Sequence, residues 1–266
     1  PFGDSSGVAL YSLDYDASTA PDATTDYSGT PTNVEFGVDG HINWGARFNG
    51  SSSRINLPIG LGDNGDRTRS MWIKINELPS SGSDFFFYVG NQNANDDYET
   101  LRINSSGNIQ LQERSNASGS GDLSLTSSIT LNANQWYHIV YVFSGTSREL
   151  YINNSTTNGA TGTKSGGTVD NSSFAANLGA FRTISNTYDG SIDQVRLFSK
   201  ALNQTEVDSL YAETACVYTG TTQSHLFGCI ANYNLDGDAK EAMGVTAYDG
   251  TESNITYEFG RFGTAA

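Results

Sequence analysis

Short runs of alternating apolar and polar residues follow one another along most of the chain. Residues 69–75 alternate, which is the period-two pattern of a half-buried strand. Residues 85–90 and 135–143 are apolar on both faces, as expected of strands inside a sandwich. About a dozen such runs, separated by turns rich in Gly, Asn and Ser, predict an antiparallel β-sandwich or jelly roll.

Two turn dipeptides predict which runs are neighbours in a sheet. Residues 46–58 carry two short apolar runs around Asn49-Gly50, a strong hairpin signal. Residues 100–112 carry two runs around Ser106-Gly107. We therefore expect each pair of runs to form a hairpin.

A turn at Asp189-Gly190 opens a further strand near the end of the main β-rich region. Simple alternation over residues 191–199 places Asp193 on the same face as Val195 and Leu197.

One short helix is predicted directly after this strand. Asn203 is a good N-cap, and Glu206, three residues later, completes a capping box. Leu202 and Val207 have the spacing of a hydrophobic staple across this helix start. No other stretch carries comparable helix signals.

Part of the N-terminal sequence is repeated after Cys216. The segment Tyr233–Ala239 resembles Tyr11–Ala17, and Glu258-Phe259-Gly260 repeats Glu35-Phe36-Gly37. Repetition at a long, fixed offset indicates a second copy of one structural unit.

This repeat predicts three parts. Residues 1–212 form a complete domain, residues 213–228 a linker with a cysteine, and residues 229–266 the N-terminal strands of a second, incomplete copy. A few strands do not bury a sandwich face alone. We therefore expect a piece of a tandem array, although strands that complete themselves on the first domain, or pair with a neighbouring chain, are alternatives.

Composition and charge narrow the possible partners. The 266 residues carry a net charge of −15, so binding to nucleic acid through its phosphates is not expected. No apolar run is long enough to span a membrane. The first residues do not resemble a signal peptide, and we expect a longer protein. Cys216 and Cys229 are a possible disulfide, with two free thiols as the alternative.

Three segments together resemble a known family. They are residues 48–55, residues 136–153, and residues 189–202 with the helix that follows. In this order they are similar to laminin G-like, concanavalin A-like jelly-roll domains (LamG, pentraxin-like) over roughly residues 8–212. The resemblance implies an all-β antiparallel sandwich with one short C-terminal helix. Tandem copies of this composition look similar to those in phage virion and tail-fibre proteins and in bacterial surface proteins.

The resemblance also implies a metal site, because many members of the family bind one calcium ion at the rim of the sandwich. Calcium takes oxygen ligands. The positions carried over are Asp14 and Asp16, in an acidic turn, and Asp193. The alternative is that these aspartates only cap turns.

Glycan binding requires an exposed aromatic ring beside Asn, Asp or Gln. Trp44 and Tyr98 stand in such surroundings, and Trp44 as a packed loop residue is the alternative. Trp72 and Trp136 lie in alternating strands, where we expect core positions.

No catalytic pattern is present. Glycosidases on this scaffold need paired carboxylates, and no Glu-x-Asp-x-x-Glu run occurs. Likewise no Gly-x-Ser-x-Gly elbow occurs. We therefore expect no enzyme activity.

The function expected is a non-catalytic structural or adhesion module of an extracellular or virion surface. It would form part of a phage fibre or tandem-repeat surface protein, with a glycan, a cell-surface receptor or further subunits as partners. The alternatives are a carbohydrate-binding module of a secreted hydrolase, or a filament subunit that uses residues 226–266 for strand pairing between subunits.

Overall fold

A computed structural model describes residues 6–14, 27–58, 65–92, 97–115, 122–165, 174–182 and 185–213, with strand residues 258–260 and 263–265. The chain divides into two compact units, one comprising Phe2–Glu213 and the other beginning at Thr214. Cys216 and Cys229, and most of the predicted second copy, lie outside the described residues.

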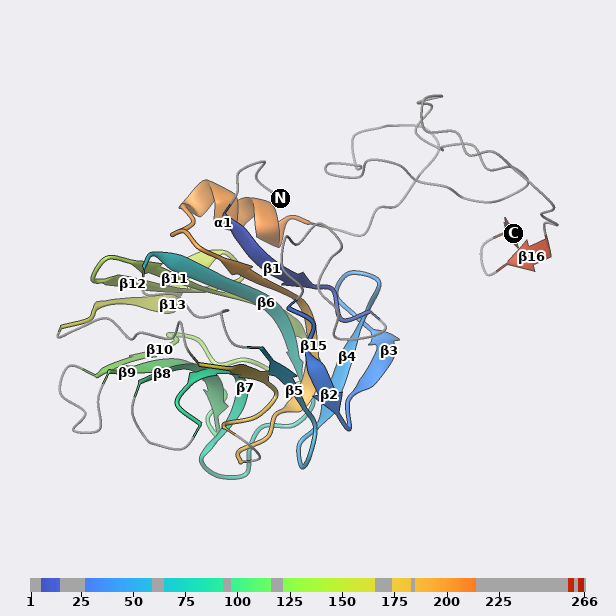
Figure 1. The fold of residues 1–266 in the computed structure, drawn as a ribbon, viewed down its shortest axis with the longest axis horizontal. Helices are drawn as coiled ribbons and strands as arrows, with labels where there is room; N and C mark the ends of the chain where they lie inside the picture. The colour runs from blue at the N-terminus through green and yellow to red at the C-terminus, as the bar shows by residue number, and fades with distance from the viewer. Residues whose placement is uncertain are drawn as a thin grey trace. The chain divides into compact units, whose positions relative to one another are not determined.

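Two antiparallel sheets form the first unit, and Figure 1 shows them as two layers. The larger sheet contains β1 (Gly7–Tyr11), β3 (Glu35–Asp39), β4 (Trp44–Asn49), β6 (Arg67–Ile75), β11 (Trp136–Ser144), β12 (Ser147–Ile152), β13 (Ser155–Thr163) and β15 (Asp189–Phe198). The smaller sheet contains β2 (Thr30–Thr32), β5 (Arg54–Leu57), β7 (Ser83–Gly90), β8 (Tyr98–Asn104), β9 (Ile109–Arg114), β10 (Leu123–Thr126) and β14 (Ala176–Leu178).

The order of the strands in each sheet is as follows. It is β13-β12-β11-β6-β15-β4-β3 in the larger sheet, where β1 also pairs with β15. In the smaller sheet it is β10-β9-β8-β7-β14-β5-β2. The predicted antiparallel sandwich is confirmed.

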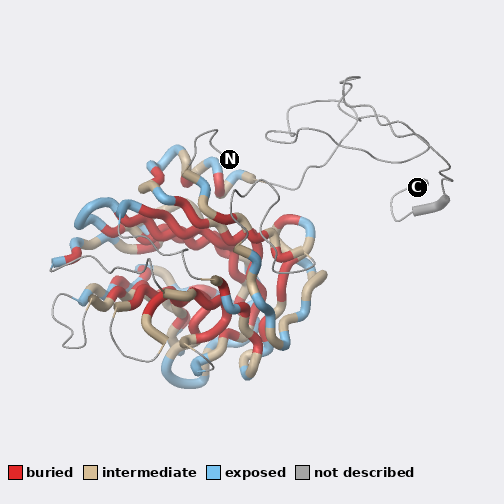
Figure 2. The backbone as a smooth tube through the Cα atoms, viewed as in Figure 1, coloured by how far each residue is buried: buried red, intermediate tan, exposed pale blue. Residues whose placement is uncertain are grey.

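The main core lies between the sheets, and Figure 2 shows the central strands as almost continuously buried. Ile73, Phe87 and Ile139 are among its fully buried members. Strand β7 is buried on both faces, as its apolar sequence predicts, because the segment that contains Phe181 packs on its outer side.

The predicted helix is present as α1 (Gln204–Tyr211), on the outer side of the larger sheet (Figure 1). The Asn203 side chain accepts a hydrogen bond from the N–H of Glu206 at 3.1 Å. The Glu206 carboxylate accepts one from the N–H of Asn203 at 3.0 Å, so the capping box is confirmed. A second, smaller core lies under the helix and includes Val207 and Leu210. Among the described residues, no helix is long and apolar enough to cross a membrane.

The predicted alternation of β15 is wrong at one point. The register shifts between Asp193 and Arg196, and Gln194 has a positive φ of 49°. This bulge turns Val195 and Leu197 into the main core, whereas Asp193 stays on the outer face.

The hairpin predicted around Asn49-Gly50 is also wrong. Strand β4 pairs with β3 and β15 in the larger sheet, whereas β5 pairs with β2 and β14 in the smaller one. The turn itself is well made, because the Asn49 Oδ1 accepts N–H groups from three successive serines, Ser51, Ser52 and Ser53. The segment therefore crosses from one sheet to the other. The β8–β9 hairpin around Ser106-Gly107 is confirmed.

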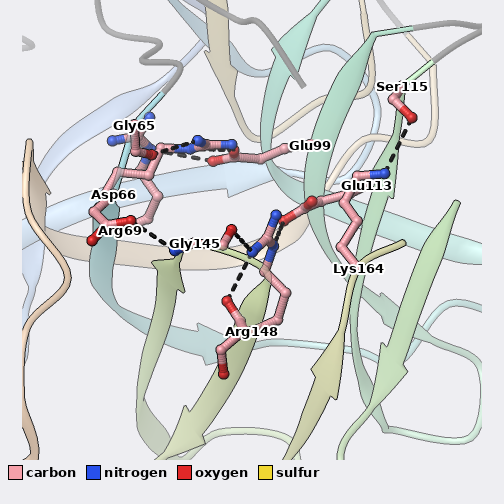
Figure 3. Close-up of polar contacts among 11 residues, drawn as sticks. Gly65, Asp66, Arg69, Glu99, Glu113, Ser115, Gly145, Arg148 and Lys164 are labelled. Atoms are coloured by element: carbon pink, nitrogen blue, oxygen red, sulfur yellow. Dashed lines mark hydrogen bonds and ion pairs between the residues drawn. The ribbon is translucent and has the colours of Figure 1, made fainter. Parts of the chain in front are cut away.

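One end of the main core is ionic, as Figure 3 shows. Arg67 and Arg69 on β6 bind Glu99 on β8, with the shortest N–O distances 2.8 and 3.2 Å. Arg148 on β12 binds Glu113 on β9 at 2.7 Å. All five side chains are at most 1% exposed, and these inter-sheet ion pairs join the larger sheet to the smaller one.

The described part of the second unit is a short antiparallel pair, β16 (Glu258–Gly260) and β17 (Gly263–Ala265). The repeated tripeptide Glu-Phe-Gly therefore forms a strand in both units, at the start of β3 and as the whole of β16.

Candidate functional site

A row of five side chains crosses the outer face of the larger sheet. The strand registers pair Trp136 with Lys74, Lys74 with Ser191, Ser191 with Arg47, and Arg47 with Glu35. We call these five residues the outer row. Paired residues in adjacent strands point to the same face. This face is turned away from the main core, because core residues flank the row along the strands: Ala46, Ile73, Ile75, Tyr137 and Ile192.

A polar hollow lies at the centre of the outer row. Ser191 is short, whereas its neighbours Lys74 and Arg47 are long, so the surface sinks between them. The hollow has a volume of about 270 Å³ and is lined by Val38, Asp39, Arg47, Lys74, Asn76, Asn134 and Ser191. The lining residues thus include two asparagines, a serine and two basic residues, while Asp39 pairs with Trp44 at the edge strand β3.

The two cations of the hollow are held differently. The Arg47 guanidinium forms an ion pair with Asp189 at 2.5 Å and donates a hydrogen bond to the Gly190 carbonyl at 3.3 Å. The Lys74 ammonium lies 5.0 Å from the centre of the Trp136 ring. Lys74 forms no ion pair with any residue that the structure describes. Among the described residues, the Trp136 indole is the partner given for its charge.

Backbone contacts fix the two asparagines at the edge of the hollow. The N–H of Asn134, just before β11, donates to the Ile75 carbonyl at 2.7 Å. The N–H of Asn76, just after β6, donates to the Asp189 carbonyl at 3.0 Å. Asn134 is thereby held at the end of β6, the strand of Lys74, and Asn76 follows directly on that strand, next to β15.

An aromatic stack borders the hollow on the same face. The Trp72 ring stacks on His41 at 3.3 Å, on His138 at 4.9 Å and on Tyr211 of α1 at 5.5 Å. Burial lowers the pKa of His41, and burial together with Arg196 and His41 lowers the pKa of His138 to about 3. Both imidazoles are therefore neutral near pH 7, and the stack is an uncharged wall.

The two tryptophans assigned to the core lie on the outer face. Trp72 is 5% exposed, but α1 and not the second sheet buries it. Trp136 is half-buried and touches His41 edge-on. The prediction of a core position is wrong for Trp136, because alternation shows that two faces differ but not which of them is covered.

The predicted metal ligands Asp14 and Asp193 meet at one turn, residues 40–44. The Asp193 Oδ2 accepts hydrogen bonds from the N–H groups of His41 and Ile42, both at 2.8 Å. The Asp14 Oδ1 accepts one from the N–H of Trp44 at 3.1 Å. Turn capping therefore occurs at both aspartates.

The second oxygen of Asp193 is different. Asp193 Oδ1 is buried and has no hydrogen-bond partner among the described residues. Burial raises the pKa of Asp193 to about 7 against the opposing effect of three backbone N–H groups, and the charge of Asp14 acts in the same direction as burial. Asp16 lies outside the described residues, and within them no group of three or more His, Cys, Asp or Glu side chains is placed to hold a metal.

The predicted sugar platforms Trp44 and Tyr98 do not face the hollow. By strand alternation Trp44 shares a face with Ala46 and Phe48 of the main core, opposite to Arg47. Tyr98 lies in the smaller sheet, packs near Tyr88 and Phe181, and is only 4% exposed. This burial argues against Tyr98 as an exposed ring for a sugar.

Comparisons with known proteins agree with this fold. A family model described as the concanavalin A-like lectin/glucanases superfamily, Laminin_G_3, matches residues 48–208. No curated protein matches the chain with significance.

Several solved structures are similar. Domain 4 of AbnA, an extracellular arabinanase from Geobacillus stearothermophilus solved with arabinotriose, has 23% identity and a TM-score of 0.65 over 77% of this chain and 98% of that chain. The binding domain of Paraclostridial Mosquitocidal Protein 1 has 20% identity and a TM-score of 0.60, over 77% of this chain and 52% of that one.

A third structure, of botulinum neurotoxin type C, has 13% identity and a TM-score of 0.60, over 78% of this chain and 51% of that one. The chain thus spans about half of each toxin structure and nearly all of the arabinanase domain. The family model covers more than half of the chain, and its span runs from β4 into α1. The chain therefore belongs to the concanavalin A-like lectin/glucanases superfamily.

Proposed function

We propose that this chain is a non-catalytic glycan-binding module and that the polar hollow beside Trp136 is its binding site. The observation that carries the proposal is the hollow itself, a concave surface lined by asparagine, serine, lysine and arginine residues next to a partly exposed indole. Sugars present many hydroxyl groups and apolar ring faces. A few placed polar groups beside an aromatic ring suit such ligands.

The similar structures support this class of ligand. The arabinanase domain was solved with arabinotriose, and the report on botulinum neurotoxin type C concerns two ganglioside molecules. Both likenesses are below 25% identity and show the shared fold alone. The ligands named for those proteins motivate the proposed class of ligand, and the hollow supports the proposed position.

The arrangement of carboxylates supports a module without catalysis. Hydrolysis of a glycosidic bond uses two carboxyl groups on either side of that bond. Asp39 is the single acidic residue among the described residues that line the hollow. Glu99 and Glu113 are opposite each other on β8 and β9, but both are buried in ion pairs with arginines.

A substitution that fills the hollow with a larger side chain tests the proposed binding site. We expect the chain to bind a set of glycans on an array, and Ser191→Leu to weaken that binding by about tenfold or more, because the larger side chain occupies the hollow. Gln112→Leu is the matched control, since Gln112 faces outward on β9 of the smaller sheet. An array without any bound glycan would refute the function. Unchanged binding by Ser191→Leu would refute the position.

We further propose a calcium ion at Asp14 and Asp193, for which the buried, unpartnered Asp193 Oδ1 is the supporting observation. Calcium accepts carboxylate oxygens together with backbone carbonyls, and would neutralise two carboxylates that share one turn. We expect calcium to raise the melting temperature and a chelator to lower it, with Asp14→Asn abolishing the difference. If neither calcium nor the chelator changes the melting temperature, the proposed calcium site is refuted.

The setting we propose is an extracellular surface. A phage fibre or tandem-repeat surface protein, a secreted hydrolase, and a self-assembling filament differ in what surrounds the module. Further repeats in the flanking sequence support a fibre, and a catalytic domain supports a hydrolase. Loss of assembly on deletion of residues 226–266 supports a filament.

A further inference from the structure

The charge of the polar hollow is unusual for this chain. The net charge is −15, and only 14 of the 266 residues are Lys or Arg. A field of this sign repels anions at long range. Two of the few cations, Lys74 and Arg47, nevertheless stand on either side of Ser191 in the outer row.

Only one of these two cations is available to a ligand. Asp189 already neutralises Arg47 at 2.5 Å. Lys74 has no carboxylate partner among the described residues and contacts the indole of Trp136. A cation–π contact at an exposed site is weak. A ligand carboxylate next to Trp136 would therefore compete well for the ammonium group.

The residues that line the hollow are distributed unevenly between its two sides. Lys74, Asn76 and Asn134 stand on the side of β6 and β11, whereas Asp39 comes from β3, beyond β15 and β4. An anionic group is attracted to the first side. Asp39 pairs with Trp44, on the face opposite to Arg47, so its carboxylate is not directed at a ligand in the hollow.

We propose that the polar hollow selects glycans that carry a carboxylate, such as uronic or sialic acids, with the Lys74 ammonium as the partner of that carboxylate. This inference rests on the proposed glycan-binding function and adds its ligand class. Asn76 and Asn134 hydrogen-bond the hydroxyls next to the carboxylate, and Trp136 packs against the ring.

Matched ligands that differ mainly in the carboxylate test the inference. Calorimetry on the whole chain would compare trigalacturonate with its methyl ester, and sialyllactose with lactose. We expect at least one acidic ligand to bind about tenfold more tightly than its neutral counterpart, and this preference to weaken with added salt.

Lys74→Gln should abolish the preference, while weak binding of the neutral ligand remains. Lys200→Gln is the matched control, because it removes the same charge from a lysine paired with Glu206 and away from the hollow. Equal binding of acidic and neutral ligands, or a preference that survives Lys74→Gln, would overturn the inference and leave glycan binding intact. If none of the four ligands binds while the array shows binding of other neutral glycans, the inference of carboxylate selectivity is also overturned. An array without any bound glycan would remove the proposed function as well.

Discussion

The backbone of one residue, Gln194, determines where the neighbouring side chains of β15 point. Its positive φ creates the bulge that sends Val195 into the core and keeps Asp193 on the outer face. Residues that adopt positive φ most readily are Gly, Asn and Asp, and Gln is not among them. The sequence thus carries no local signal for the bulge, and alternation alone predicts the wrong neighbours for Asp193.

Both the backbone conformation and the packing around position 179 require glycine. Its φ is +80°, and a Cβ there would lie 2.1 Å from the Phe48 ring. We expect Gly179→Ala to lower the free energy of unfolding by about 3 kcal/mol or more, through strain and displacement of a core ring.

Gly82 separates these two effects. Its φ is +71°, but a Cβ would meet nothing within 4 Å. Gly82→Ala should therefore lower the free energy of unfolding by only about 1–2 kcal/mol, the effect of left-handed backbone alone. Urea denaturation of both variants measures the difference, and equal losses would contradict the role of Phe48.

At the scale of elements, local signals predict helix α1 better than they predict strand pairing. Asn203 and Glu206 are three residues apart, so the sequence itself contains the complete capping box. The Asn49-Gly50 turn is equally well made, but it joins two different sheets. A turn dipeptide fixes the path of the chain and not the partner of the strand that follows.

The N-cap of α1 gives a prediction at this scale. Asn203→Ala should lower the free energy of unfolding by about 1 kcal/mol, because the N–H of Glu206 loses its acceptor. Asn203→Asp keeps an acceptor and should leave the stability nearly unchanged. Urea denaturation followed by circular dichroism would measure both variants, and a loss of the same size in Asn203→Asp would contradict the capping role.

For the whole molecule, the family motifs predict the sandwich, but they do not predict the polar hollow. The outer row joins residues 35, 47, 74, 136 and 191, which come from five strands scattered along the chain. Their alignment depends on the register of four strand pairs. No single segment contains that register, which explains why Trp136 is missed as a surface residue. Tyr98 is predicted as a surface residue because its contact with the distant Phe181 is equally invisible in the local sequence.

The inter-sheet ion pairs affect the stability of the whole sandwich. Burial alone would raise the pKa of Glu99, but Arg67 and Arg69 outweigh it and hold that pKa below its usual 4.5. A lowered carboxyl pKa stabilises the folded state above the unfolded pKa, and this stability is lost as the pH falls below it. We therefore expect Glu99→Gln to destabilise the fold by about 3–5 kcal/mol near pH 7, since it removes the one negative charge that Arg67 and Arg69 share in the buried ion pairs.

The difference between wild type and Glu99→Gln should shrink as the pH falls from 4.5 through the lower pKa of folded Glu99, because the unfolded wild-type chain binds the proton first. Urea denaturation of both proteins across this range measures it. Glu77→Gln, at an exposed position just after β6, removes the same charge and provides a control for the total charge. A difference that stays constant with pH would show that the charge of Glu99 is not what holds the sheets together.

The five positions of the outer row could be substituted together to change the surface of the larger sheet in protein engineering. Each of its five positions belongs to a different strand, and the backbone ladders, not the side chains, set their spacing. Randomising these five positions together would create a small combinatorial library on one rigid platform. Selection from such a library would yield new ligand specificities while the opposite faces of the same strands continue to specify the fold.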